Sequence, residues 1–496
     1  MPSEKNLKKS LSNSLIWNFD NSYLKLPQTL FVRQTPTPVA DPKLVIFNDA
    51  LAKGLGLNTE GVSADRWAET LGGNEIPSGA EPIAQAYCGH QFGGFAMLGD
   101  GRALLLGEHV TPDGSRWDIQ LKGSGQTPFS RRGDGRAALG PMLREYIISE
   151  AMFALGIPTT RSLAVVVTGE LVYRETAQKG AVLTRIAASH IRVGTFEYLR
   201  ARKDLSTLKA LADYTLQRHF SERVGEPAPY SALLEAVVER QAALIARWMA
   251  VGFVHGVMNT DNVSIAGETI DYGPCAFMDT YDPDTVFSSI DRDGRYAFGH
   301  QPAIGGWNLA RLAEALLPLL DEQESRAIEI AQEVLGKYPQ RFEHHWLSEM
   351  SAKLGIQANQ EGDRVLVQEW LDLLATHKMD FTNAFRMLSS DLPQDQAAVS
   401  TGAFADWHLR WTARLGQQAG AVDAAREMMR QKNPVFIPRN HRVEEALRAA
   451  DEDGNYKPIE ELLRVLASPF QDDPVWVAYK NPPGPEFRDY QTFCGT

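Results

Sequence analysis

The spacing of the apolar residues changes once along this chain, near residue 195. Between residues 99 and 194, short stretches alternate apolar and polar side chains, as half-buried strands do. Beyond residue 195 the apolar residues recur at helical spacing, and from about residue 305 onward the chain is mostly amphipathic helix. Strands gathered in one part of a chain and helices in another predict an α+β fold with two lobes.

The second expected strand places a lysine on its polar face. Two strands flank a turn at residues 112–114, and period two in the second one puts Lys122 on the face opposite its apolar residues, which are Trp117, Ile119 and Leu121. A helix follows. Pro141 suits its first turn and Gly156 suits the position after its last residue, so Glu145 lies near its start.

Two or three more strands are expected before the helical part. Two of them flank a turn at residues 168–170, and the third contains Arg185. Arg192 comes just beyond that third strand. Arginines in such positions most often lie on the surface or pack against neighbouring side chains, but the planar guanidinium group also suits phosphate oxygens.

Length and charge limit the classes of protein to consider. A chain of 496 residues exceeds one domain of roughly 100–200 residues. We divide it into an N-terminal extension packed on the core (1–98), a strand-rich lobe with one helix (99–194), a helical lobe (195–320) and a helical C-terminal extension (321–496). The formal net charge of -12 argues against nucleic acid or a membrane surface as partner.

The number of cysteines and the hydropathy of the chain indicate where in the cell the protein is found. Three cysteines are too few for a disulfide-built secreted scaffold, and the N-terminus has no continuous apolar segment of the kind found in secretory signals. No stretch approaches the 18 or more apolar residues of a membrane span. We therefore expect a cytoplasmic protein.

A polar loop and the strand after it resemble the metal-binding part of a protein kinase. His255 precedes Asn262 by seven positions, and residues 271–273 read Asp-Tyr-Gly where kinases have Asp-Phe-Gly. Asn262 and Asp271 offer the oxygen ligands that Mg²⁺ or Mn²⁺ prefer. Each motif is weak by itself. Together with the strand lysine and the helix glutamate, in this order, they predict a kinase-like nucleotide site.

The sequence departs from the pattern of a protein kinase in two ways. Val257 stands where the catalytic aspartate belongs, and valine cannot accept a proton. The nearest replacement is Asp261, for which a structural role in the loop is as good an interpretation as a catalytic one. The second departure is an excess of cations. Besides Arg185 and Arg192, the segment 120–140 combines small residues with charged ones and reads either as a phosphate-covering loop or as an exposed linker.

Four blocks of the sequence resemble a known family. YCGHQFGGFAMLGDGRA, LKGSGQTPFSRRGDGRAALGPMLREYI, ASHIRVGTFEY and HGVMNTDNVSIAGETIDYGPCAFMD are similar to signature segments of the selenoprotein O family, and the similarity runs over most of the chain. The resemblance implies a protein-kinase-like fold, ATP bound in an inverted orientation, and transfer of AMP to Ser, Thr or Tyr hydroxyls of proteins, possibly including the chain itself.

The resemblance also implies a role for each matching residue. Lys122 would contact the phosphates and pair with Glu145, while Arg185 and Arg192 would hold the departing pyrophosphate. Asn262 and Asp271 would bind Mg²⁺ or Mn²⁺, and Asp261 would accept the proton of the protein hydroxyl. Further nucleotide-contacting positions would be Gly99, Gly101, Arg102, Asp134 and Gly135.

The resemblance extends to two cysteines. Cys494 is third from the C-terminus, where eukaryotic members carry selenocysteine, and Cys275 lies four residues after Asp271. A redox pair between them is a hypothesis on those placements. Two other functions stay open: a phosphotransferase that uses Asp261 as its base, and an ATP-binding pseudokinase that acts as a scaffold.

Overall fold

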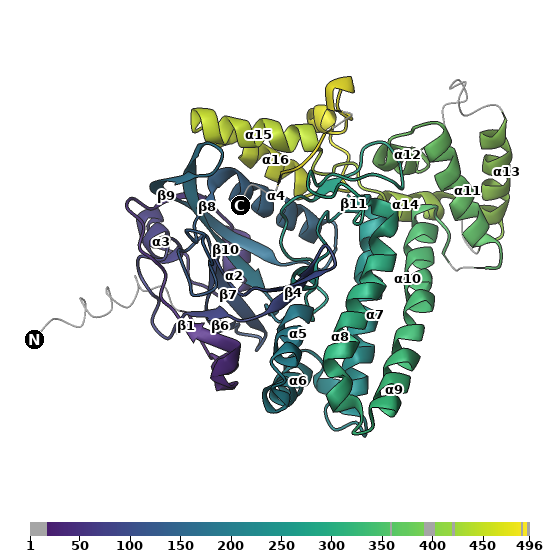
Figure 1. Ribbon diagram of the computed structural model, residues 1–496. Coiled ribbons are helices and arrows are strands. Elements are labelled where there is room, and N and C mark those ends of the chain that lie inside the picture. The colour runs from purple at the N-terminus through teal and green to yellow at the C-terminus, as the bar shows by residue number, and fades with distance from the viewer. Residues whose placement is uncertain (1–16, 358–359, 391–401, 419–421, 488–489, 494–496) are drawn as a thin grey trace, which may run out of the picture.

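The computed structural model describes residues 17–357, 360–390, 402–418, 422–487 and 490–493. It is a mixed α and β structure, with one large sheet on one side and long helices on the other (Figure 1). Strands dominate up to residue 187 and helices dominate from residue 193, which confirms the expected order of elements. Among the described residues, no helix combines the length and apolarity needed to cross a bilayer.

The large sheet has eight strands. Seven run in the order β1-β3-β6-β7-β10-β9-β2, and the short β8 pairs with β10. The strands are β1 (Phe31–Arg33), β2 (Lys43–Phe47), β3 (Ile83–Gln85), β6 (Ala103–Val110), β7 (Arg116–Lys122), β8 (Ala137–Ala138), β9 (Arg161–Tyr173) and β10 (Ala177–Ala187). Three of them, β1, β2 and β3, come from the first 98 residues. This part of the chain therefore extends the sheet on both of its edges.

Two smaller sheets lie outside the large one. A hairpin joins β4 (Cys88–Gln91) to β5 (Gly94–Met97), and β11 (Phe253–Val254) pairs with β12 (Ala276–Phe277). The β11–β12 pair brackets the loop that carries Asn262 and Asp271. The hairpin precedes β6 directly.

Helices form most of the remainder. They are α2 (Asp49–Gly54), α3 (Ala64–Leu71), α4 (Leu139–Ala154), α5 (Val193–Ala201), α6 (Leu205–His219), α7 (Pro229–Val251), α8 (Gln301–Leu320), α9 (Glu324–Gly336), α10 (Tyr338–Lys353), α11 (Asp363–Thr376), α12 (Phe381–Met387), α13 (Ala403–Gly416), α14 (Val422–Lys432), α15 (Asn440–Asp453) and α16 (Lys457–Leu466). A short 3₁₀ turn, η4 (Thr260–Asn262), lies between β11 and β12.

The expected turn at residues 168–170 is wrong, because β9 continues through it as one strand. Pairing with β10 holds on both sides, Val167 with Ala181 and Leu171 with Lys179, and an irregular register between these pairs absorbs two extra residues of β9. Gly169 lies there with a φ of 74°, a conformation that favours glycine. The glycine therefore marks a bulge in a long strand.

The helix α4 is buried on nearly all sides. Pro141 lies in its first turn and Gly156, with a φ of 76°, follows its C-cap residue Leu155, as expected. Its apolar side chains share one core with the sheet and with α15 and α16. Each leucine or isoleucine fully buried there contributes about 1.5–3 kcal/mol. The C-terminal helices thus hold in place the helix that carries Glu145.

Candidate functional site

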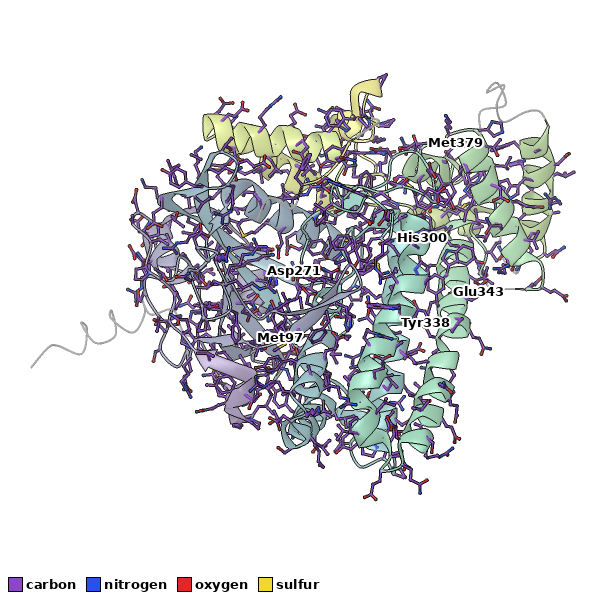
Figure 2. The ribbon with its side chains drawn as sticks, in the orientation of Figure 1. Met97, Asp271, His300, Tyr338, Glu343 and Met379 are labelled. Carbon is purple, nitrogen blue, oxygen red and sulfur yellow. The ribbon has the colours of Figure 1, made fainter. Side chains whose placement is uncertain are left out.

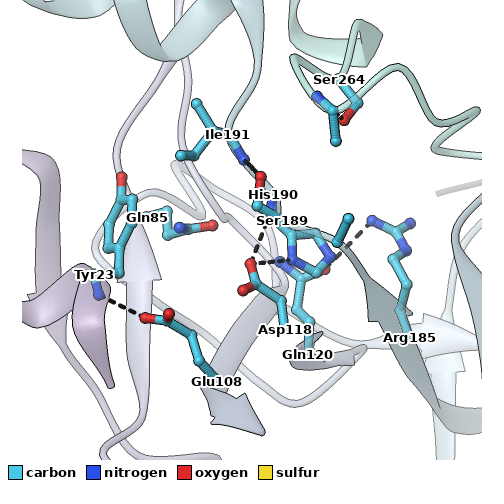
Figure 3. A network of polar contacts seen from close by, with 12 residues as sticks. Tyr23, Gln85, Glu108, Asp118, Gln120, Arg185, Ser189, His190, Ile191 and Ser264 are labelled. Carbon is cyan, nitrogen blue, oxygen red and sulfur yellow. Dashed lines mark hydrogen bonds and ion pairs between the residues drawn. The ribbon is translucent and has the colours of Figure 1, made fainter. Parts of the chain in front are cut away.

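The polar side chains of β7 form hydrogen bonds with buried groups of other parts of the chain. The Asp118 carboxylate accepts from the backbone N–H of His190 at 2.9 Å, and Gln120 Oε1 accepts from Arg185 Nη1 at 3.3 Å (Figure 3). Lys122 is the third residue on this face. Because buried polar groups need hydrogen-bond partners, the alternation in β7 determines where the neighbouring charges must lie.

Lys122 lies at the centre of a cluster of five charged residues. Its Nζ donates to Glu145 Oε2 at 2.6 Å and to Asp271 Oδ1 at 2.9 Å. Arg185 donates through Nη2 to Glu145 Oε1 and to Asp271 Oδ1, both at 2.5 Å. Arg192 Nη1 lies 3.3 Å from Asp271 Oδ2. The structure therefore brings together five residues that lie far apart in the sequence.

The charges of this cluster do not cancel. Lys122, Arg185 and Arg192 supply three positive charges, and Glu145 and Asp271 supply two negative ones. Burial alone would raise the pKa of Asp271, but Arg185, Lys122 and Arg192 outweigh it and hold that pKa well below its usual range. Burial likewise opposes ionisation of Glu145, and Arg185 and Lys122 keep its pKa lowered. Both carboxylates are therefore ionised, and these five residues carry a net charge of +1 before the neighbouring Asp100 is counted.

The backbone at Asp271 is held in a conformation that non-glycine residues rarely adopt. Its φ is 64°, in the left-handed region. The residue before it is anchored, since the buried His255 shares a hydrogen bond of 3.0 Å between its Nε2 and the carbonyl of Ile270. The residue after it, Tyr272, is buried as well. Strain of this kind collects at functional sites, because the surrounding structure must maintain it.

The loop after β11 orients the candidate metal ligand Asn262. Its Nδ2 donates to the carbonyl of Val257 at 3.0 Å, so its Oδ1 is the atom left for a cation. Val257 itself is buried. The residue at which the sequence pattern would place the base of a kinase thus serves here as a backbone acceptor.

Asp261 is buried directly beneath the β4–β5 hairpin. Its side chain is covered so closely that a Cβ placed on Gly89 of β4 would lie 2.0 Å from Oδ1. That Oδ1 has no hydrogen-bond partner among the described residues, and Oδ2 lies 3.5 Å from Gln91 Nε2. Burial raises the pKa of Asp261 to about 6, against the opposing effect of Arg192. A carboxyl group with one oxygen that lacks a partner and with a raised pKa is suited to accept a proton.

Three polar contacts hold the hairpin in place, two to the loop below it and one to α5. The backbone N–H of His90 donates to Thr260 Oγ1 at 2.7 Å, and that of Phe92 donates to Asn259 Oδ1 at 3.1 Å. The ring Nδ1 of His90 lies 2.5 Å from Glu197 Oε1 in α5. Figure 2 labels Met97 of the hairpin and Asp271, and both lie in the middle of the molecule between the sheet and the long helices.

Two further residues belong to this site, although the interpretation of the sequence did not single them out. The Tyr87 ring lies 4.4 Å beneath the Arg192 guanidinium, and Asp100 Oδ1 lies 3.9 Å from Arg192 Nη2. Both residues lie within the block YCGHQFGGFAMLGDGRA, so the resemblance of this block to the family is the sequence signal that could have identified them. Both contact Arg192 in addition to Asp271.

The glycine-rich segments around residues 99–102 and 123–137 pack on each other. A Cβ on Gly99 would lie 2.4 Å from the Phe129 ring, and one on Gly135 would lie 2.1 Å from the backbone of Gly125. Gly101 lies against the backbone of Phe129 and Ser130, and the carbonyl of Arg102 accepts from Gly123 N–H at 2.7 Å, next to Lys122. A larger side chain at Gly99 or Gly135 would collide with these neighbours, which explains why glycine occupies both positions.

Asp134 is turned toward a different partner. Its two carboxylate oxygens accept from Arg174, at the β9–β10 turn, at 2.8 and 3.0 Å, and Arg174 lowers its pKa. No contact between Asp134 and the charged cluster is present among the described residues. The structure therefore places Arg102 beside the end of β7 that carries Lys122, whereas Asp134 is held by Arg174.

The oxygen atoms at the site fit a hard divalent cation. Asp271 offers a carboxylate, Asn262 an amide oxygen, and Asp261 a buried oxygen that lacks a partner among the described residues. The adjacent cations Lys122 and Arg185 suit the phosphates that such an ion accompanies. The residues present are therefore compatible with a metal–nucleotide ligand.

The predicted cysteine pair is described only in part. Cys275 is buried beneath Arg144, whose Nη2 donates to its carbonyl at 2.8 Å, and burial raises the pKa of its thiol to about 12. Cys494 lies outside the described residues. The last part of the described chain does reach this segment, because Thr492 Oγ1 donates to the carbonyl of Pro274 at 2.8 Å.

Comparisons with known proteins give one consistent family. The model of the family described as protein adenylyltransferase SelO matches residues 14–467. Proteins named protein nucleotidyltransferase YdiU are similar over nearly the full length of both chains. The one from Geobacillus kaustophilus is 59% identical over 97% of this chain and 99% of its own, and the one from Bacillus cytotoxicus is 56% identical over 99% and 100%. A third, from Brevibacillus brevis, is 58% identical over 97% and 98%.

Proposed function

The chain belongs to the protein adenylyltransferase SelO family of nucleotidyltransferases, and from that premise we propose that it transfers AMP from ATP to Ser, Thr or Tyr hydroxyls of proteins. The observation that carries the proposal is the arrangement around Val257. A kinase needs its base at this position, whereas here a buried carboxylate, Asp261, lies four residues further on and two arginines are added to the lysine.

The proposed reaction is a displacement at the α-phosphorus. The oxygen of the protein hydroxyl forms a bond to that phosphorus, and the bond from it to the bridging oxygen of the β-phosphate breaks. Pyrophosphate leaves with the electron pair of the broken bond, and Asp261 accepts the hydroxyl proton. Fixed cations that stabilise the negative charge of the leaving group are expected to be the largest catalytic term.

The cations of the cluster divide this work. Arg185 and Arg192 hold the β- and γ-phosphates, because their guanidinium groups bind oxygens in pairs. Lys122, aimed by Glu145 at 2.6 Å, contacts the same chain of phosphates. The proposal has the reacting α-phosphate toward Asp261, with ATP inverted relative to its orientation in a kinase. The proposal includes a protein-kinase-like arrangement of sheet and helices, with the site between them.

A divalent metal is part of the proposal. Asn262 and Asp271 are its protein ligands, and either Mg²⁺ or Mn²⁺ suits their oxygens. When bound, the ion neutralises phosphate charge and fixes the phosphates in position. The two glycine-rich segments contact the nucleotide through Gly99, Gly101, Arg102 and Gly135. Asp134 could contact it only after its ion pair with Arg174 breaks.

Labelled nucleotides test the proposal directly. The purified protein is incubated with Mg²⁺ or Mn²⁺ and with ATP labelled at either the α- or the γ-phosphate, and protein-bound label is measured on itself and on added proteins. Only α-label supports AMP transfer. Only γ-label supports a phosphotransferase with Asp261 as base, and neither label supports a pseudokinase scaffold. A parallel arm with α-labelled UTP establishes whether ATP is the preferred donor.

We also propose that Cys275 and Cys494 form a redox pair. Support comes from Thr492, two residues before Cys494, which bonds to the carbonyl next to Cys275. The raised pKa of the Cys275 thiol makes it a slow nucleophile, so the Cys494 thiolate would first attack a small disulfide oxidant and release one thiol from it. Cys275 would then displace the second thiol of the oxidant and close the Cys275–Cys494 bond. Peptide mapping of the oxidised protein without reductant should yield a linked peptide, and two free thiols would refute the pairing.

A further inference from the structure

The β4–β5 hairpin, which covers Asp261, presents large apolar side chains to solvent. Phe92 is 38% exposed, Phe95 49% and Met97 48%, all within six residues. Isolated exposed apolar residues need no explanation, but a group of them on one short hairpin indicates a surface for binding. Phe95 and Met97 alternate along β5 and so share a face.

The other strand of the same hairpin contacts the proposed base. Gly89 of β4 leaves no room for a side chain over Asp261 Oδ1, and Gln91 Nε2 lies 3.5 Å from its Oδ2. The hairpin is also fixed to Thr260 and Asn259, on either side of the turn that carries Asp261. A hydroxyl that reaches Asp261 must therefore come from a segment that lies beside this hairpin.

Arginines surround the apolar side chains. Arg131 Nη2 donates to the carbonyl of Met97 at 2.6 Å and is exposed, and the Arg295 guanidinium lies against Gly93 in the hairpin turn. Arg295 and Arg311 both stack on Trp307, at 4.8 and 4.9 Å, and the Trp307 ring meets His90 edge-on at 5.4 Å. Of these three arginines, Arg311 is paired with Glu314 at 2.6 Å. A chain with a formal net charge of -12 thus places positive charge here.

We propose that this hairpin is the docking surface for the hydroxyl-bearing segment of the protein substrate. The segment it fits is extended, with apolar side chains near the modified residue to cover Phe95 and Met97 and an acidic side chain to meet Arg131 or Arg295. Acidic and basic surfaces that face each other give specificity and a faster encounter, and apolar contacts give affinity. The inference rests on the proposed function, because it takes Asp261 as the acceptor of the hydroxyl proton.

A positional-scanning peptide library with α-labelled ATP tests it. Each peptide carries one Ser, Thr or Tyr with varied neighbours, and the enzymes are wild type, Phe95→Ser, Met97→Ser and Leu409→Ser. Leu409 is a matched control, because it is 71% exposed on the distant helix α13. We expect wild type to select apolar and acidic neighbours. The two hairpin variants should raise the peptide KM about tenfold and lose the apolar selection, whereas Leu409→Ser should not.

Two controls separate docking from other effects. The rise in melting temperature caused by Mg–ATP should be equal in all four proteins, which shows that the nucleotide site is intact. Sedimentation should give the same mass for wild type and the hairpin variants, and a dimer lost only in those variants would overturn the inference in favour of a second copy. Wild-type peptide selection retained in Phe95→Ser and Met97→Ser would also overturn it, with the proposed function unharmed. A wild type that labels no peptide and releases no pyrophosphate removes both proposals.

Discussion

Replacing Glu145 with glutamine isolates the part of the site that depends on one buried charge. Glu145 is 2% exposed and accepts from Lys122 at 2.6 Å and from Arg185 at 2.5 and 2.9 Å. Glu145→Gln keeps the shape of the side chain but removes its charge. Two buried cations are then left with Asp271 as their remaining carboxylate partner in the cluster.

The expected loss is large in both stability and activity. Removing one partner of a buried ion pair costs about 3–5 kcal/mol, because the other charge stays buried without compensation. Lys122 also loses the contact that aims it, and misplacing a catalytic group by about 1 Å can lower kcat/KM about 10²-fold. Glu150→Gln is the matched control. Glu150 lies on the same helix and accepts from Arg161 at 2.6 and 2.8 Å, but away from the cluster.

Two measurements decide the matter. Thermal and urea unfolding should show Glu145→Gln to be the less stable variant, and transfer of α-label should fall about 10²-fold in Glu145→Gln and stay near wild type in Glu150→Gln. If Glu145→Gln transferred label at the wild-type kcat/KM, Lys122 would not need its partner, and the argument from the charged cluster would be refuted.

Three further perturbations have clear expected outcomes. Asp261→Asn should lower kcat about 10²–10⁴-fold while the Mg–ATP shift in melting temperature persists, and an unchanged kcat would contradict the role of base. Asp271→Ala should abolish transfer with Mg²⁺ and with Mn²⁺, and continued transfer would count against the metal role. Burial lowers the pKa of Lys353 to about 7, whereas an unfolded lysine keeps its proton to about pH 10.4. The unfolded chain thus binds more protons between these values, so stability should rise with pH by about 1.4 kcal/mol per unit. Lys353→Met should remove this slope in urea unfolding at pH 7.5 and 9, and an unaltered slope would place its origin elsewhere.

The sequence predicted the local elements of the site well, because local patterns determine them. Period two in β7 identified the face of Lys122, and Pro141 and Gly156 marked the ends of the helix that carries Glu145. Arg185 lies in a strand and Arg192 just beyond it, as expected. Where a residue lies on its own strand or helix follows from its nearest neighbours in sequence.

Tertiary relations were beyond the reach of such patterns. Gly169 reads as a turn residue, and only the pairing of β9 with β10 on both sides makes it a bulge. The strands of the first 98 residues are short, so nothing in their spacing indicated that they extend the large sheet. The cover over Asp261 comes from Gly89, more than a hundred residues away, and depends on a contact that no periodicity reports.

The packing of α4 has a consequence for the order in which this protein can mature. The helix shares its core with α15 and α16, and Arg144 is paired with Glu444 of α15 at 2.9 Å. A ribosome makes Glu145 and Asp271 long before it makes those helices, and domains fold as their parts emerge. Until α15 and α16 emerge, one side of α4 has no cover, and the cluster around Lys122 lacks its outer support. A chain still being translated should therefore be unable to modify its neighbours, and the newly made protein gains its activity only when synthesis is nearly over.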